Sequence, residues 1–293
     1  MSAEISVFKS AEKEKEFVAA YDEAMKLWPV PYETIYISTR FGETYVIVSG
    51  SEEGEPILLF PGFSFCSPSW YANVETLGAK HRIYAVDVID DLGRSKASVV
   101  PETREELADW LREVCEGLNI EKPHLVGLSS GAFLAINFAY HYPDLVGKVI
   151  LLAPAAIFGK LSLMFWIQVF SLSILPIKSR RAGFLKWMVV DPKVWDNAHG
   201  DLIRLTMRVV AAPIKKVYPS VFTDEELKRI KNSTLLIVGE HEVMYKNAPR
   251  AIERAKQLMP NLQVELLPYC GHAVPLESAE FVNSRILDFL VEG

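Results

Sequence analysis

A Gly-x-Ser-x-Gly motif between a predicted strand and a predicted helix constrains this chain most. The apolar run His124–Leu128 has β character, and Ser129 and Gly131 follow it before a helical pattern begins. A turn this sharp needs small neighbours, because the strand and the helix must approach closely. We therefore expect Ser129 to present its hydroxyl at the carboxyl end of a strand. The alternative is an ordinary strand-to-helix turn that contains a serine.

The motif lies within a regular alternation of strand and helix patterns. An amphipathic helix at about 10–28 and an antiparallel hairpin, Tyr32–Arg40 with Thr44–Ser49, come first. A capping box at Thr103 to Glu106 predicts the start of a helix. Buried strands are predicted at Pro56–Phe60 and Arg82–Asp87, and further strands at His124–Leu128, Lys148–Leu152, Thr234–Val238 and Gln263–Leu267. This order predicts an α/β fold, with a mostly parallel sheet covered by helices on both faces.

Residues 155–222 interrupt the alternation. This segment is aromatic and apolar and has no strand pattern, so we expect a helical cap inserted into a core formed by 1–154 and 223–293. Its run Leu161–Ile177 is apolar but short, and it contains serines, Gln168 and Pro176, which favours a lid helix over a membrane span. Four aromatic residues are expected to line a substrate pocket there: Phe165, Trp166, Phe170 and Trp187.

Charge and cysteine content exclude some classes of partner. The net charge is −6 and no basic cluster occurs, which argues against nucleic-acid binding. The three cysteines have no paired spacing, and Met1–Phe17 contains no apolar signal segment, so we expect a cytoplasmic protein. No His-x-x-x-His or Cys/His cluster is present, so neither a metal nor another cofactor is expected. Oligomeric state cannot be read from these features.

The motif serine needs a base and an acid. A serine hydroxyl becomes nucleophilic when a histidine takes its proton, and a buried acid orients that histidine. On this kind of sheet the order is serine, acid, histidine, each after a strand. His272 follows the last strand and is the expected base, and Glu242 is the expected acid, with Glu240 as the alternative. The competing interpretations are a histidine bonded to backbone and a solvated loop carboxylate.

Two backbone amides should stabilise the oxyanion that forms during attack on a carbonyl. One is the N–H of Ser130, the residue after the nucleophile. The other should come from the loop after Phe60, where Phe63 is the expected donor. Gly62 allows close backbone approach, and Pro61 has no N–H to donate.

Together these motifs resemble those of the α/β-hydrolase superfamily. They are Phe60-Pro-Gly-Phe63, Asp87 through Gly93-Arg-Ser95, Gly127 to Gly131, Val238 to Glu242 and Gly271-His272, and they span nearly the whole chain. Further stretches resemble bacterial carboxylesterases of the naproxen-esterase type: Leu27–Val30, Tyr36–Gly42, Val221–Leu227 and Gly239–Val243. This resemblance implies a Ser-Glu-His triad and esters with bulky apolar acyl groups. The chain departs from the wider superfamily at Pro61, where His-Gly is usual, and at Glu242, where Asp is usual.

The sequence therefore predicts a serine carboxylesterase that acts on a small-molecule ester through an acyl-enzyme. A lactonase or a carbon–carbon bond hydrolase with the same triad is the first alternative, because this fold hosts many reactions. A protein that binds an apolar ligand without turnover is the second, and its signature would be a broken triad. The natural substrate and the enantiopreference are not fixed by the sequence.

Overall fold

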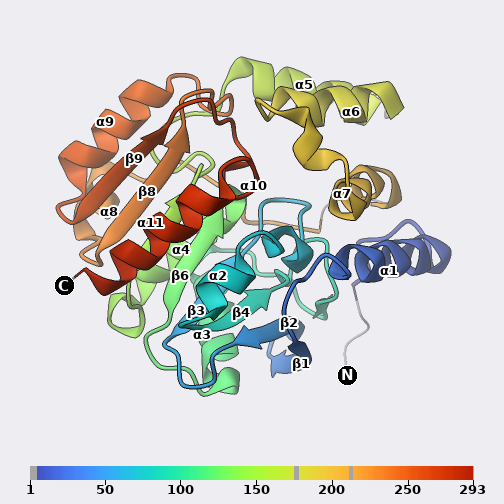
Figure 1. Cartoon of the computed structure of the whole chain (residues 1–293), viewed down its shortest axis with the longest axis horizontal. Helices are drawn as coiled ribbons and strands as arrows, with labels where there is room; N and C mark the ends of the chain where they lie inside the picture. Colours follow the sequence, from blue (N-terminus) through green and yellow to red (C-terminus); the bar gives the residue numbers. More distant parts are fainter. Residues whose placement is uncertain (1–4, 175–177, 211–213, 293) are drawn as a thin grey trace.

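The computed structural model describes residues 5–174, 178–210 and 214–292. Within them the strands form one mixed sheet in the order β1-β2-β4-β3-β6-β7-β8-β9, with β5 paired to β2 (Figure 1). All pairs from β4 to β9 are parallel, whereas β1, β2 and β5 pair antiparallel. The predicted fold class is confirmed. The strands are Tyr32–Thr39 (β1), Gly42–Gly50 (β2), Pro56–Phe60 (β3), Arg82–Val86 (β4), Lys96–Ala97 (β5), His124–Leu128 (β6), Val149–Leu152 (β7), Thr234–Gly239 (β8) and Leu262–Leu267 (β9).

Helices cover both faces of the sheet, and side-chain alternation along the strands explains why. In β3, Leu58 and Phe60 pack into the core beneath α3 and α4, whereas Ile57 and Leu59 pack beneath α1, α2 and α11. The core helices are Ala11–Met25 (α1), Val74–Gly78 (α2), Arg104–Leu118 (α3), Ser130–His141 (α4), Asp224–Arg229 (α8), Ala248–Leu258 (α9), Val274–Glu277 (α10) and Ala279–Val291 (α11). Short 3₁₀ turns lie at Ser67–Trp70 (η1) and Pro143–Leu145 (η2).

The helix starts differ from the prediction in one detail. Thr103 does cap α3, because its hydroxyl accepts from the N–H of Glu106 at 3.1 Å. The reciprocal bond is not made: the Glu106 carboxylate accepts from the N–H of Glu102, so the predicted capping box is only half correct. A complete box opens α8 instead, where Thr223 and Glu226 bond each other's backbone.

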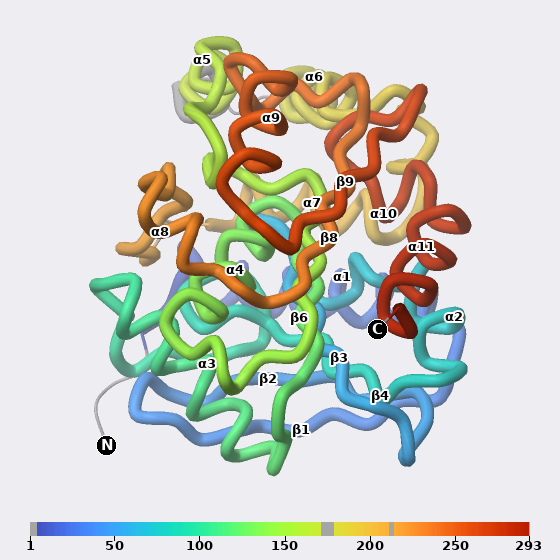
Figure 2. Tube along the Cα trace, turned by 90° about the vertical axis from the view of Figure 1, so that its left-hand side faces the viewer, coloured from blue at the N-terminus to red at the C-terminus, as the bar shows by residue number. Residues whose placement is uncertain are grey.

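Between β7 and β8 the chain forms Leu163–Ile174 (α5), Lys178–Trp187 (α6), Pro192–Trp195 (η3) and Ala198–Val209 (α7). Figures 1 and 2 show α5 and α6 together at one end of the molecule, whereas α7 packs against α1. Residues 175–177, the end of the predicted lid helix, lie outside the described residues. Among those described, no helix combines the length and apolar character that crossing a bilayer requires. The division into core and cap stays a prediction.

Candidate active site

Ser129 occupies the turn between β6 and α4, in a strained backbone conformation. Its φ of 55° and ψ of −111° lie outside the regions that residues with a side chain prefer. The turn is tight because a Cβ on Gly127 would overlap the Gly131 backbone, and one on Gly131 would overlap the Phe60 carbonyl. The sequence thus places Ser129 where a nucleophile would stand, directly before the first turn of α4.

Glu242 and His272 meet beyond the ends of β8 and β9. The Glu242 Oε2 lies 2.8 Å from His272 Nδ1, and the Glu242 side chain is 0% exposed. Its other oxygen, Oε1, accepts from the N–H of Met244 at 2.7 Å, so both oxygens of the carboxylate have partners. Glu240, the alternative acid, is exposed. This arrangement fixes one ring nitrogen of His272 and leaves Nε2 as the nitrogen that could exchange a proton with a serine.

The loop after β3 lies over Ser129. A Cβ built on Gly62 would stand 3.6 Å from the Ser129 Cβ, and the N–H of Phe65 closes a turn on the Gly62 carbonyl at 2.9 Å. Phe63 is on this turn, and its ring lies 6.3 Å from that of Tyr218. Residues 62–65, which include the predicted oxyanion donor Phe63, are called the oxyanion loop below. Ser130, the other predicted donor, is the first residue of α4.

Two carboxylates near the site escaped the sequence analysis. The Asp91 Oδ1 accepts from the N–H of Ser64, inside the oxyanion loop, at 3.1 Å. Glu277 accepts from Gly271 at 3.0 Å and from Val190 at 2.6 Å, which joins the loop that carries His272 to the segment after α6. Burial raises the pKa of Glu277. Both carboxylates accept from backbone amides, and neither partner follows from a motif spacing.

Among the predicted pocket residues, the rings of Phe165 and Trp166 lie 5.3 Å apart. Trp166 and Phe170 on α5 are 56% and 67% exposed. Phe165 and Trp187 pack partly against a cluster formed within residues 185–273 by Leu185, Met188, Val189, Trp195, Ile203, Met244 and Ala273. None of the four lines the two cavities described below. Their place in a substrate pocket therefore stays a prediction.

His199 is the one histidine of α7, and it lies beneath the oxyanion loop. Its ring is 6.1 Å from that of Phe65 and 5.8 Å from that of Tyr71, and among the described residues neither ring nitrogen has a partner. Burial lowers the pKa of His199 from 6.5 to about 3. Between pH 6.5 and about 3, the His199 ring is therefore neutral in the folded protein but protonated in the unfolded chain.

We expect His199 to make the protein acid-sensitive. Below pH 6.5 the unfolded state binds a proton on His199 that the folded state does not bind. The free energy of unfolding therefore falls as the pH drops toward about 3. The loss should approach roughly 1.4 kcal/mol per pH unit within that window. His199→Leu should remove this part of the pH dependence, measured by urea unfolding at several pH values. His241→Gln, at an exposed histidine, is the control and should leave the slope unchanged. An unaltered slope in His199→Leu would contradict the assignment.

Comparison with known proteins places this chain among hydrolases. The profile of the alpha/beta hydrolase family matches residues 57–285. Carboxylesterase YbfK of Bacillus subtilis is 36% identical, over 98% of this chain and 97% of its own length. The crystal structure of naproxen esterase (carboxylesterase NP) from Bacillus subtilis superposes with a TM-score of 0.91 at 33% identity, covering 96% of this chain and 99% of that one. A 2-hydroxy-6-oxo-6-phenylhexa-2,4-dienoate hydrolase of Burkholderia cepacia is 28% identical over 82% of this chain and 89% of its own.

Proposed function

Because this chain belongs to the alpha/beta hydrolase family, we propose that it is a serine carboxylesterase that works through an acyl-enzyme on Ser129. The proposal that it hydrolyses carboxylic esters is supported by two Bacillus subtilis relatives, which align over nearly their full lengths. The reaction route rests on one observation above the others. A buried glutamate holds a histidine at 2.8 Å beyond β8 and β9, and a serine in a strained turn stands at the end of β6, on the same sheet.

In the proposed reaction, His272 Nε2 takes the Ser129 hydroxyl proton while Oγ attacks the ester carbonyl carbon. The carbonyl electron pair moves to oxygen, which the amides of Ser130 and Phe63 stabilise. The intermediate collapses when His272 returns the proton to the departing alcohol oxygen, which leaves the acyl group on Ser129. Water then repeats the sequence, with His272 again as base, and releases the carboxylic acid. Glu242 keeps the imidazole oriented and stabilises its charged form.

For the substrate we propose esters with bulky apolar or aromatic groups. Two observations support this proposal. The segment between β7 and β8 carries Phe165, Trp166, Phe170 and Trp187, and one relative is named naproxen esterase. Aromatic side chains provide large apolar surfaces with a definite orientation, which suits recognition of such groups.

The test is a panel of p-nitrophenyl esters of graded acyl size, run beside lactones and a diketone. We expect a burst of alcohol on the ester panel, turnover that favours bulky acyl groups, and stoichiometric labelling of Ser129 by an organophosphonate. Faster turnover of lactones or of the diketone would favour the alternative reactions of the same triad. Tight binding of an apolar ligand without turnover would favour a binding protein. An unlabelled Ser129 in folded protein would refute the proposal.

A further inference from the structure

Asp91 bonds directly to the oxyanion loop. Its Oδ1 accepts from the N–H of Ser64 at 3.1 Å and from the N–H of Leu92 at 2.8 Å. Ser64 has a φ of 61°, a conformation that a residue with a side chain adopts only when its surroundings hold it there. Ser64 follows Phe63, so the bond to Asp91 restrains the backbone next to the predicted oxyanion donor.

An ion pair lies beside this carboxylate. Lys215 pairs with Asp90, and their side chains are 6% and 0% exposed. The Asp90 Oδ2 is buried and has no hydrogen-bond partner among the described residues. Lys215 belongs to the segment 214–222 that returns from α7 to the core, as does Tyr218, whose ring lies near that of Phe63. This return segment therefore contacts the oxyanion loop and also the acidic pair beneath it.

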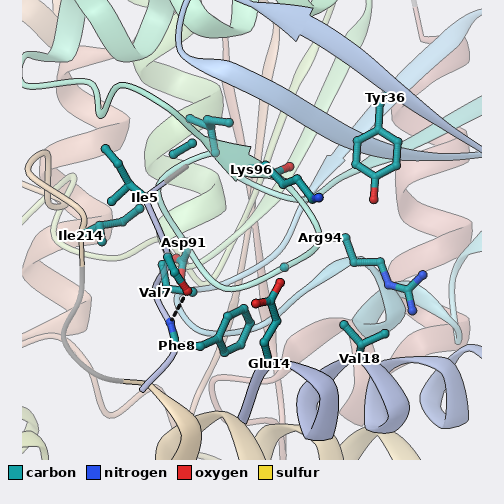
Figure 3. A pocket seen from close by; sticks show the side chains of 15 residues that line it. Ile5, Val7, Phe8, Glu14, Val18, Tyr36, Asp91, Arg94, Lys96 and Ile214 are labelled. Carbon is teal, nitrogen blue, oxygen red and sulfur yellow. Dashed lines mark hydrogen bonds between the residues drawn. The ribbon is translucent and has the colours of Figure 1, made fainter. Parts of the chain in front are cut away.

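Charged groups surround Asp91 on several sides. Asp91 is partly exposed, because a cavity of about 220 Å³ reaches it, as does a much smaller one that Lys215 lines. Figure 3 shows Asp91 in the larger cavity together with Glu14, Arg94 and Lys96. Asp91 also acts on the buried Cys66 thiol, whose pKa is raised by burial and further by Asp87 and Asp91.

The charge of Asp91 changes near neutral pH. Burial raises its pKa to about 7, the Lys215 ammonium lowers it, and the neighbouring Asp90 carboxylate raises it. An ionised carboxylate accepts a backbone hydrogen bond more strongly than a protonated one. The hydrogen bond from the Ser64 N–H to Asp91 should therefore strengthen as the pH rises through about 7.

We propose that Asp91 is a positioning residue that holds the oxyanion loop in its catalytic conformation, and that the Asp90–Lys215 pair controls its charge. The inference rests on the proposed esterase function and adds a residue that touches neither substrate nor triad. It also gives the return segment a direct effect on the oxyanion donor, because Lys215 is the cation of the cluster.

The first test compares Asp91→Ala with Asp91→Asn on an ester that the wild type hydrolyses. Asp91→Ala loses the hydrogen bond that Asp91 accepts from Ser64. Because the oxyanion donors act in the transition state, kcat should fall about 10- to 100-fold, whereas KM should stay within about threefold of the wild type. Asp91→Asn keeps an acceptor oxygen without charge and should fall between that variant and the wild type. Glu14→Gln removes a carboxylate that lines the same cavity without bonding Ser64, and should leave kcat unchanged. Equal kcat in wild type and folded Asp91→Ala would overturn the proposal.

The second test uses pH profiles of kcat, which a merely structural role would not move. Wild-type kcat should contain a rise near pH 7 that Asp91→Asn lacks. Lys215→Met should move this rise to higher pH and Asp90→Asn to lower pH, whereas any dependence due to His272 is common to all variants. If both variants shifted the rise in the same direction, the Asp90–Lys215 pair would not control the charge of Asp91. If Lys215→Met does not fold, the pH profiles of Asp90→Asn and Asp91→Asn still test the proposal. A wild type without esterase activity would instead refute the proposed function.

Discussion

Ser129→Ala is expected to lower kcat for ester hydrolysis by about 10⁴- to 10⁶-fold, because it removes the only atom that can form the proposed acyl-enzyme. The substitution deletes one oxygen from a partly exposed side chain, so the strained turn and the fold should survive. Steady-state rates on the fastest ester of the panel, with the thermal midpoint as a check on folding, measure this directly. Residual rates should still exceed the reaction in water, since the oxyanion donors remain.

Ser130→Ala is the matched control. Ser130 is the next residue in the chain and also a serine, but its proposed contribution is its backbone N–H, which alanine retains. We expect its kcat to stay within about threefold of the wild type. If Ser130→Ala were as inactive as Ser129→Ala, or if Ser129→Ala kept its burst of alcohol, the assignment of the nucleophile would be wrong.

Glu242→Gln should give the second-largest loss, about 10³- to 10⁴-fold in kcat. The amide has the same shape as the carboxylate but cannot stabilise the imidazolium, and its NH₂ group favours the wrong imidazole tautomer. Because the Glu242 side chain is 0% exposed, water cannot replace the lost charge. KM should change little, since no substrate group contacts this residue in the proposed reaction.

Glu240→Gln separates the two glutamates that the sequence left open. Glu240 is exposed and follows β8 directly, so we expect near-wild-type kcat. The two variants carry the same chemical change only two positions apart. A larger loss in Glu240→Gln than in Glu242→Gln would show that the acid has been misassigned, while the serine and histidine assignments would stand.

The central strands of the sheet were predictable because they are buried on both faces. A run such as Pro56–Phe60 has no solvent-facing position, so its composition alone marks a central parallel strand, and the observed β3 has those same bounds. The first helix was predicted to within a few residues, at about 10–28 against the observed Ala11–Met25, since helix ends depend on local caps. At α3 the choice between two backbone partners of the Glu106 carboxylate, Thr103 and Glu102, is a matter of side-chain rotamer that spacing does not determine.

Chain order made Ser129, Glu242 and His272 the candidates, because each follows a strand, and the structure brings Glu242 and His272 together. Asp91 and Glu277 accept hydrogen bonds from backbone amides of loops, and such bonds can be predicted only when the path of the loop is known.

The aromatic residues of α5 show the same limit of prediction from sequence. Their apolar character predicted a pocket lining, but helix orientation decides which side chains face solvent, and Trp166 and Phe170 are more than half exposed.

The Glu277 carboxylate ties the base to the segment after α6, which has a consequence for selectivity. The N–H of His272 donates to the Met188 carbonyl at 2.7 Å, and Glu277 accepts from Val190 as well as from Gly271. An ester that binds only when residues 188–190 move would break these bonds or displace the imidazole with them. Such an ester would bind at the expense of proton transfer from Ser129. Discrimination against it would then appear as slow turnover of bound substrate rather than as weak binding.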